Sequence, residues 1–138
     1  MELNGETLRF IREHCKDDVR SLALQAPKYP GVDMPVALTQ IAGRQAAAEK
    51  IPSWHEEEGV LYPRHLSLEQ CSSEATARYK ASIIPESSSG TLTDLTGGFG
   101  IDCAFLSPKF HHVTYVERQE VLCEIASHNF PLLGLNHI

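Results

Sequence analysis

The fold is decided by the stretch Asp94-Leu95-Thr96-Gly97-Gly98-Phe99-Gly100-Ile101-Asp102. It overlaps residues 91–95, whose composition predicts a buried strand. A helix is predicted over 101–106, a second strand over 112–116, and a second helix from Arg118 to about Asn129. This order of strand, glycine loop, helix, strand and helix is typical of the opening of a doubly wound, Rossmann-like α/β domain.

The glycines of this loop mark a candidate ligand site. Small residues at a strand-to-helix turn let the backbone pass close to a ligand, and the start of the helix offers unpaired N–H groups. Glu117 ends the second predicted strand twenty-three residues after Asp94, where a carboxylate can accept hydrogen bonds from both hydroxyls of a ribose. As alternatives, Asp94 caps the turn and Asp102 is a favourable partner of the helix dipole.

The residues before this stretch indicate helices joined by loops. Apolar residues at three- and four-residue steps predict a helix over 6–25, which a cap at Asp17 or Asp18 would divide into two. Prolines and a glycine predict a loop over 26–33. The next predicted helix starts at Pro35 and ends before residue 52.

The last part of this N-terminal half leads to the predicted domain boundary. Residues 52–63 are predicted to be irregular, and Ser67 with Gln70 resembles a capping box that opens one helix, which Pro85 stops. A short polar joint over 86–90 follows. We therefore expect a helical N-terminal domain over 1–84 and the start of a Rossmann-like domain over 85–138.

Composition narrows the function classes. The 138 residues carry a formal net charge of -6 and are 42% hydrophobic, as in an ordinary globular domain. A negative net charge disfavours a free-standing binder of nucleic acid or of anionic membranes. Without a leader pattern or a long apolar run, we expect a cytoplasmic protein with no membrane partner. The scattered cysteines, and a His55-Glu56 pair that lacks its second histidine, predict no metal site.

Residues 91–136 resemble the first two motifs of class I methyltransferases that use S-adenosylmethionine. The resemblance implies that Asp94 and the glycine loop hold the methionine end of the cofactor and that Glu117 holds its ribose. Thr96 stands where many members have their first glycine. That variant, with a Gly-x-Asp ending at 100–102, resembles RNA-modifying members, so the resemblance implies an RNA acceptor.

A second resemblance concerns residues 68–80, which are similar to a segment that precedes the glycine motif in some RNA methyltransferases. It implies that Gln70, Ser72, Ser73 and Thr76 donate hydrogen bonds to the methionine carboxylate, although the polar face of an ordinary helix explains them equally well. The arrangement as a whole resembles a bacterial family of methyltransferases with a THUMP-like region. The candidate cofactor-binding residues are Gln70, Ser73, Asp94, Thr96, Gly97, Gly98, Gly100, Asp102 and Glu117, and no catalytic residue is identified.

Two other functions stay open. A dinucleotide-dependent oxidoreductase would place a third glycine where Cys103 stands. A non-catalytic interaction module would use the helical residues 1–84, with the α/β part as a scaffold. Stabilisation by S-adenosylhomocysteine, by NAD or by neither separates the three functions.

The last expectation is that these residues form the N-terminal part of a longer enzyme and are inactive alone. His137 would begin a third strand, and no acceptor-binding motif of the resembled family occurs in the sequence. A parallel sheet of two strands leaves long unpaired edges. We therefore also expect self-association through an exposed sheet edge.

Overall fold

The computed structural model describes residues 3–86 and 90–138 and shows a helix-rich α/β chain. Its parallel sheet consists of β1 (Thr91–Asp94) and β2 (His112–Tyr115). The helices are α1 (Gly5–Glu13), α2 (Val19–Leu24), η1 (Ala26–Lys28), α3 (Met34–Lys50), α4 (Pro52–Glu56), α5 (His65–Gln70), α6 (Glu74–Ser82), α7 (Ile101–Leu106), η2 (Ser107–Lys109) and α8 (Glu120–Leu132).

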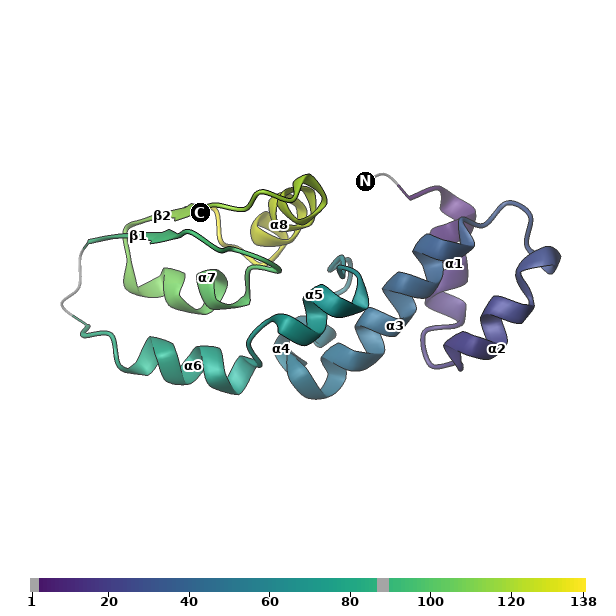
Figure 1. Cartoon of the computed structure of the whole chain (residues 1–138), viewed down its shortest axis with the longest axis horizontal. Coiled ribbons are helices and arrows are strands. Elements are labelled where there is room, and N and C mark those ends of the chain that lie inside the picture. Colours follow the sequence, from purple (N-terminus) through teal and green to yellow (C-terminus); the bar gives the residue numbers. More distant parts are fainter. Residues whose placement is uncertain (1–2, 87–89) are drawn as a thin grey trace.

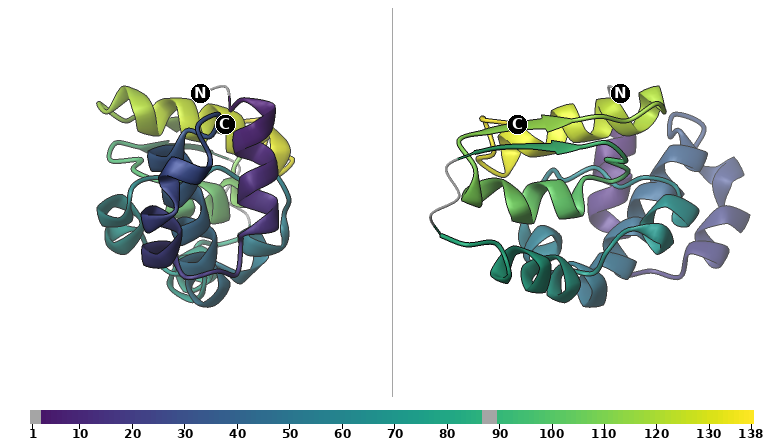
Figure 2. Two further views of the ribbon diagram at one scale, coloured as in Figure 1. Left: turned by 90° about the vertical axis from the view of Figure 1, so that its right-hand side faces the viewer. Right: turned by 60° about the vertical axis from the view of Figure 1, so that its left-hand side comes forward.

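The elements form an elongated molecule with helices at one end and the sheet at the other (Figure 1). Helices α1, α2 and the start of α3 occupy the first end, and α5 lies between this end and the sheet. Helix α7 lies beneath the two strands and α6 runs beneath α7, an arrangement that both views of the sheet show (Figures 1 and 2). The sheet is thus covered from below by two successive helices.

The predicted division of the first helical stretch is confirmed, and of the two predicted candidates Asp18 is the cap. The Asp18 carboxylate accepts a hydrogen bond from the backbone N–H of Ser21 at 2.9 Å and caps α2. This hydrogen bond holds the pKa of Asp18 below its ordinary value. Helices α1 to α3 then pack around a small apolar cluster of Phe10, Leu22, Met34, Ala37 and Ile41.

The single helix predicted from Ser67 to Pro85 is wrong, because the chain breaks it at residues 71–73. Helix α5 ends at Gln70, Cys71 is extended, and α6 starts at Glu74. Ser73, not Ser67, is the capping residue: its hydroxyl accepts a hydrogen bond from the backbone N–H of Thr76 at 3.2 Å. The ammonium group of Lys50 donates to the last carbonyls of α5, at 2.6 and 2.7 Å, and so stabilises the early end.

Two further sequence predictions need correction. Residues 52–63 are not wholly irregular, because α4 forms where a buried carboxylate, that of Glu74, accepts a hydrogen bond from the Ser53 N–H at 2.9 Å. Helix α8 begins at Glu120 rather than at Arg118, since the preceding turn is held by the side chain of Glu117. It also continues to Leu132, past its predicted end at Asn129.

One apolar core runs through both predicted domains. It joins Trp54 and Tyr62 of the helical part to Phe99, Val113 and Phe130 of the α/β part. The division at 84/85 is therefore not a gap in packing, and the domain assignment stays a prediction. Among the described residues, no helix is long and apolar enough to cross a membrane.

Two side-chain amides fix the extended segment 61–62 inside this core. Gln40 of α3 exchanges two hydrogen bonds with the backbone of Tyr62, at 2.8 and 2.9 Å. Asn129 of α8 does the same with the backbone of Leu61, at 2.8 and 2.9 Å. Each buried amide thus replaces the partner that a neighbouring strand would supply, and together they join α3 to α8.

Candidate cofactor site

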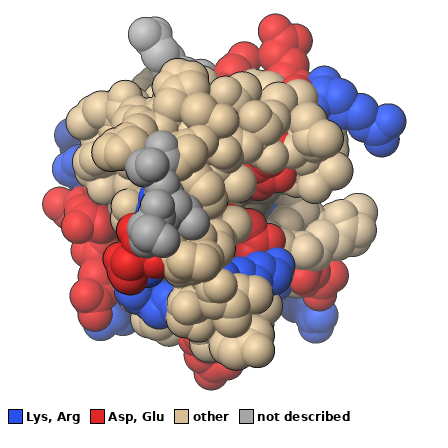
Figure 3. Space-filling view, turned by 90° about the vertical axis from the view of Figure 1, so that its left-hand side faces the viewer, with Lys and Arg blue, Asp and Glu red and all other residues tan. Residues whose placement is uncertain are grey.

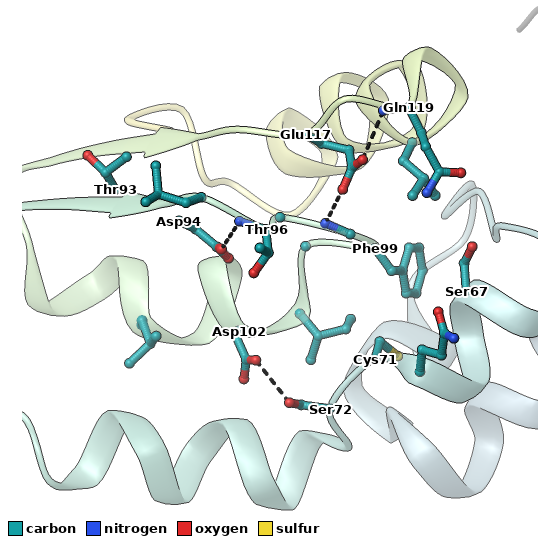
Figure 4. Close-up of a pocket in the computed structure, with 18 of the residues that line it drawn as sticks. Ser67, Cys71, Ser72, Thr93, Asp94, Thr96, Phe99, Asp102, Glu117 and Gln119 are labelled. Carbon is teal, nitrogen blue, oxygen red and sulfur yellow. Dashed lines mark hydrogen bonds between the residues drawn. The ribbon is translucent and has the colours of Figure 1, made fainter.

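A cavity of about 700 Å³ lies at the carboxyl ends of the two strands, the usual place of ligands in open α/β sheets (Figure 4). The pairing of Asp94 with Tyr115 brings the ends of β1 and β2 to the same edge. The glycine loop and α7 form further walls of the cavity, and the break between α5 and α6 forms another. Segments far apart in the sequence therefore meet at one hollow.

The turn after β1 is fixed by its own hydrogen bonds. Asp94 accepts a hydrogen bond from the backbone N–H of Thr96 at 3.1 Å, so it caps the turn as the alternative in the sequence predicts. The N–H of Gly97 donates to the carbonyl of Val116 at 2.9 Å and ties the loop to the strand beside it. Asp94 lines the cavity, and its other carboxylate oxygen has no hydrogen-bond partner among the described residues.

Close packing and backbone conformation require glycine in this loop. A Cβ atom at Gly97 would lie 2.2 Å from the ring of Tyr115, and one at Gly100 would lie 2.8 Å from the ring of Phe130. Gly98 and Gly100 have φ values of +54° and +90°, which side chains disfavour. The Tyr115 hydroxyl donates to the Gly98 carbonyl at 2.6 Å. Burial raises the pKa of Tyr115, which keeps this donor protonated.

Glu117 holds the glycine loop against the start of α8. One carboxylate oxygen accepts from the Gly98 N–H at 2.9 Å, and the other accepts from the Gln119 N–H at 2.8 Å (Figure 4). The hydrogen bond from Gln119, followed by that from Gly98, keeps the pKa of Glu117 below its ordinary value despite some desolvation. The group is therefore ionised at neutral pH, and each oxygen can accept one more hydrogen bond from a ligand.

Asp102 connects α7 to the break between α5 and α6. Its Oδ2 accepts from the Ser72 hydroxyl at 2.9 Å and from the Lys80 ammonium group at 2.9 Å. Lys80 also donates to the Ser72 hydroxyl at 3.0 Å, which closes a triangle of polar groups. The other oxygen, Oδ1, is buried and has no hydrogen-bond partner among the described residues. A buried carboxylate oxygen without a donor is costly, which favours a ligand donor there.

The structure brings the predicted site residues together with one exception. Gln70, Asp94, Thr96, Gly97, Gly98, Gly100, Asp102 and Glu117 all line the cavity. Ser73 is not among the lining residues, because its hydroxyl caps α6. The roles of these residues as cofactor ligands stay predictions.

Several lining residues were missed by the sequence reasoning. Lys80 enters the cavity wall because the helix breaks at residues 71–73, and only recognition of Ser73 as a cap would have signalled that break. Ser72, which the sequence analysis names as a candidate donor, also lines the cavity. Ser67, Cys71 and Gln119 also line the cavity. Burial raises the pKa of the Cys71 thiol, and this thiol donates to the Leu68 carbonyl at 3.0 Å.

The charge of the cavity is negative. Its charged lining residues are the carboxylates of Asp94, Asp102 and Glu117 and the ammonium group of Lys80. Lys80 is already paired with Asp102, so the other two carboxylates stand without a basic side chain beside them in the lining. Such a hollow favours a ligand that carries positive charge. Within 3–86 and 90–138, no three His, Cys, Asp or Glu side chains are grouped as metal ligands would be.

The comparison with solved structures finds a match over almost the entire chain. A protein from Porphyromonas gingivalis W83 that is assigned as a methyltransferase superposes with a TM-score of 0.74 and 31% sequence identity over 96% of this chain. The fold is methyltransferase-like. This chain spans 33% of the length of that protein. The match therefore does not by itself assign the activity of a whole enzyme to this chain. No protein-family model and no curated protein sequence matches the chain.

Proposed function

We propose that this chain forms the cofactor-binding N-terminal part of a class I methyltransferase that uses S-adenosylmethionine. The observation that carries the proposal is the negatively charged cavity at the strand ends, with Asp94, Asp102 and Glu117 in its wall. S-adenosylmethionine carries a sulfonium and an ammonium group against one carboxylate, so its net charge is positive. Its charge thus complements that of the cavity.

The residues present fit this cofactor. Glu117 would accept hydrogen bonds from the ribose hydroxyls with the acceptor sites that its two backbone partners leave free. Asp94, Thr96 and the loop 97–100 would hold the methionine end. The unpartnered Oδ1 of Asp102 would accept a hydrogen bond from that end, and Gln70, at the end of α5, also lines the cavity.

When bound, the cofactor supplies an electrophilic methyl group, which a lone pair of the acceptor takes while the carbon–sulfur electron pair returns to sulfur. The residues of this chain would bind the cofactor and orient its methyl group. The backbone turn held by Tyr115 and Glu117 keeps the loop open to a ligand without rearrangement. Such positioning is the main source of rate in direct displacement.

The charge of the cavity also weighs against the oxidoreductase alternative. NAD carries two phosphates, which the carboxylates of Asp94 and Glu117 would repel. The interaction-module alternative gives no reason for a polar cavity at the glycine loop. Both alternatives predict that S-adenosylhomocysteine leaves the stability of the chain unchanged.

We further propose that the native enzyme is longer and that its acceptor is RNA. The carbonyl of His137 accepts a hydrogen bond from the N–H of Val113, at 3.2 Å, so the residues after α8 return to the outer edge of β2. Further strands could extend the sheet there or at β1, and in their absence a second copy could pair with a free edge.

The chain by itself offers RNA little charge attraction. On the described face in Figure 3, Lys and Arg side chains are interspersed with Asp and Glu rather than gathered in one basic area. The net charge of -6 likewise disfavours binding to the phosphates of RNA. An RNA acceptor would therefore need a local contact or basic residues elsewhere in a longer enzyme.

The test is titration calorimetry with S-adenosylmethionine and with S-adenosylhomocysteine, which lacks the sulfonium charge and should bind less tightly. Glu117→Ala should weaken binding by about 1–3 kcal/mol, the usual cost of removing a charged hydrogen-bond partner. Gly98→Val should abolish binding, because a branched side chain disfavours the φ of +54° and would extend toward the ligand. Glu120→Ala, in the exposed first turn of α8, is the matched control. Unchanged affinity in Glu117→Ala, or tighter binding of NAD than of S-adenosylhomocysteine, would contradict the proposal.

A further inference from the structure

A groove of about 480 Å³ adjoins the candidate cofactor site. It lies between α3, the connector before α5, and the start of α8, and it shares Ser67, Gln119 and Leu122 with the cavity. The two hollows are therefore neighbours with a common wall. A methyl acceptor must reach the cofactor from a space that is continuous with it, because the reacting atoms must come into contact. The groove meets the first condition for this, because it lies directly beside the cavity and the two share three lining residues.

The walls of the groove differ in chemistry from those of the cavity. Arg64 is the charged residue among those that line it, and the Arg64 guanidinium has no hydrogen-bond or ion-pair partner within the described residues. The remaining walls are largely apolar and include Val36, Pro63 and Ile125. Val121 is 56% exposed, so its apolar side chain is accessible to a ligand. The groove thus suits a flat apolar group attached to an anion.

Two uncommitted polar side chains stand where the hollows meet. In Figure 4 the carboxamide of Gln119 and the hydroxyl of Ser67 lie at the same end of the cavity and point toward one another. Neither side chain has a hydrogen-bond partner among the described residues, although the backbone N–H of each has one. A carboxamide and a hydroxyl can both donate and accept, which is what recognition of the edge of a heteroaromatic ring requires.

We propose that this groove binds the methyl acceptor and that the acceptor presents a nucleotide unit, a heteroaromatic ring with a phosphate. The ring packs against Val121 and Val36, its edge meets Ser67 and Gln119, and Arg64 pairs with the phosphate. The inference rests on the proposed function, because it places the second substrate of the same centre. The unit can come from a free nucleotide or from a single-stranded RNA, and the same chemistry recognises both.

The experiment measures binding of AMP, GMP, CMP and UMP to the chain saturated with S-adenosylhomocysteine. We expect at least one nucleotide to bind beside S-adenosylhomocysteine, and inorganic phosphate or the free nucleoside to bind more weakly. Arg64→Gln should reduce nucleotide affinity by about 10- to 100-fold, the effect of losing one charge-assisted hydrogen bond. Gln119→Ala should reduce it as well, while the affinity for S-adenosylhomocysteine stays unchanged in Arg64→Gln. Arg20→Gln, an exposed arginine of α2, is the matched control.

The outcomes separate this inference from the proposed function. If S-adenosylhomocysteine binds but no nucleotide does, or if nucleotides displace S-adenosylhomocysteine, the groove is not an acceptor site and the inference fails alone. If S-adenosylhomocysteine does not bind at all, the proposed function fails and the inference fails with it. A short single-stranded oligoribonucleotide that binds more tightly than any mononucleotide identifies RNA as the source, and equal affinities identify the free nucleotide. Either result supports the groove as the acceptor site, and the second contradicts the proposed RNA acceptor.

Discussion

The two ends of the molecule differ in whether their polar groups find hydrogen-bond partners. At the helical end, Asn4, Asp18 and Asp33 cap α1, α2 and α3 with their own side chains, and a small apolar cluster closes the packing. At the sheet end, Leu95 is 74% exposed, Val116 is 40% exposed, and Asp102 keeps an oxygen without a partner. The helix starts of the first end are thus satisfied by their own side chains, although Leu24 of α2 is 85% exposed. The second end differs in keeping a buried polar atom, Oδ1 of Asp102, without a partner among the described residues.

The middle of the molecule explains how the open end stays ordered. Phe99, from the glycine loop, is 2% exposed and packs edge-on against Trp54 with ring centroids 5.2 Å apart. The ring of Tyr62 also lies close to that of Phe99, with centroids 6.1 Å apart. The loop that faces the cavity is thus anchored in the core of the helical part. The comparison teaches that the helical part acts as a support for the ligand-facing loop, and the following predictions test this.

The largest expected effect is that of Phe99→Ala. Loss of a buried aromatic side chain from this cluster should reduce the free energy of unfolding by about 3–5 kcal/mol. Denaturant unfolding measures this change in the free energy of unfolding. Leu95→Ala, four residues earlier and exposed, should change the stability by less than about 0.5 kcal/mol. Equal effects of the two substitutions would show that the helical part does not anchor the loop.

The next effect concerns the amide that joins α8 to the helical part. Asn129→Ala should destabilise the chain by about 2–3 kcal/mol, because the N–H and carbonyl of Leu61 lose their partners inside the protein. Ser127→Ala, exposed on the same helix, is the control. A double-mutant cycle with Gln40→Ala should give a non-additive loss, since both amides hold neighbouring residues of one segment. Additive losses would mean that Gln40 and Asn129 stabilise the segment 61–62 independently of each other.

A smaller effect is expected inside the sheet end itself. Gly100→Ala should cost about 1–2 kcal/mol, because φ is +90° and the new Cβ would meet the ring of Phe130 at 2.8 Å. Gly90→Ala should be neutral, as nothing lies within 4 Å of the added atom. Thermal unfolding of the two variants makes the comparison. A stable Gly100→Ala variant would show that the loop conformation is not fixed by its packing.

The smallest expected effect is a dependence on pH at the helical side. Burial acts to raise the pKa of Glu74, but hydrogen bonds from Ser53 and the ion pair with Arg78 outweigh it and hold the pKa below 4.5. A carboxyl group with a lowered folded-state pKa adds stability above its unfolded pKa and loses it as the pH falls through the folded value.

The stability of the wild type should therefore decline more steeply with acid below pH 4.5 than that of Glu74→Gln. Urea midpoints measured from neutral pH downward give the slopes, with Glu120→Gln as an exposed control. Parallel slopes for wild type and Glu74→Gln would show that this carboxylate does not link α4 to α6 in solution.

The amino-acid sequence by itself determined the elements whose signals are local. The glycines at 97, 98 and 100 predicted the turn after β1, because a close approach of backbone and positive φ values admit few other residues. The composition of residues 91–95 and 112–116 predicted both strands. The pair Asp17 and Asp18 predicted the start of α2 to within one residue, since capping is a contact between residues three apart. The parallel order of strands predicted that Asp94 and Glu117 would meet at one edge.

Only the tertiary structure decided the contacts between distant segments. The break between α5 and α6 depends partly on Lys50, which reaches the end of α5 from α3. The pairing of Lys80 with Asp102 joins residues 22 positions apart, and that of Leu61 with Asn129 joins residues 68 apart. No local pattern encodes such pairs, because each is set by how whole elements pack. The negative charge of the cavity, which decides what it can bind, also arises from this packing, because it brings carboxylates from different elements together.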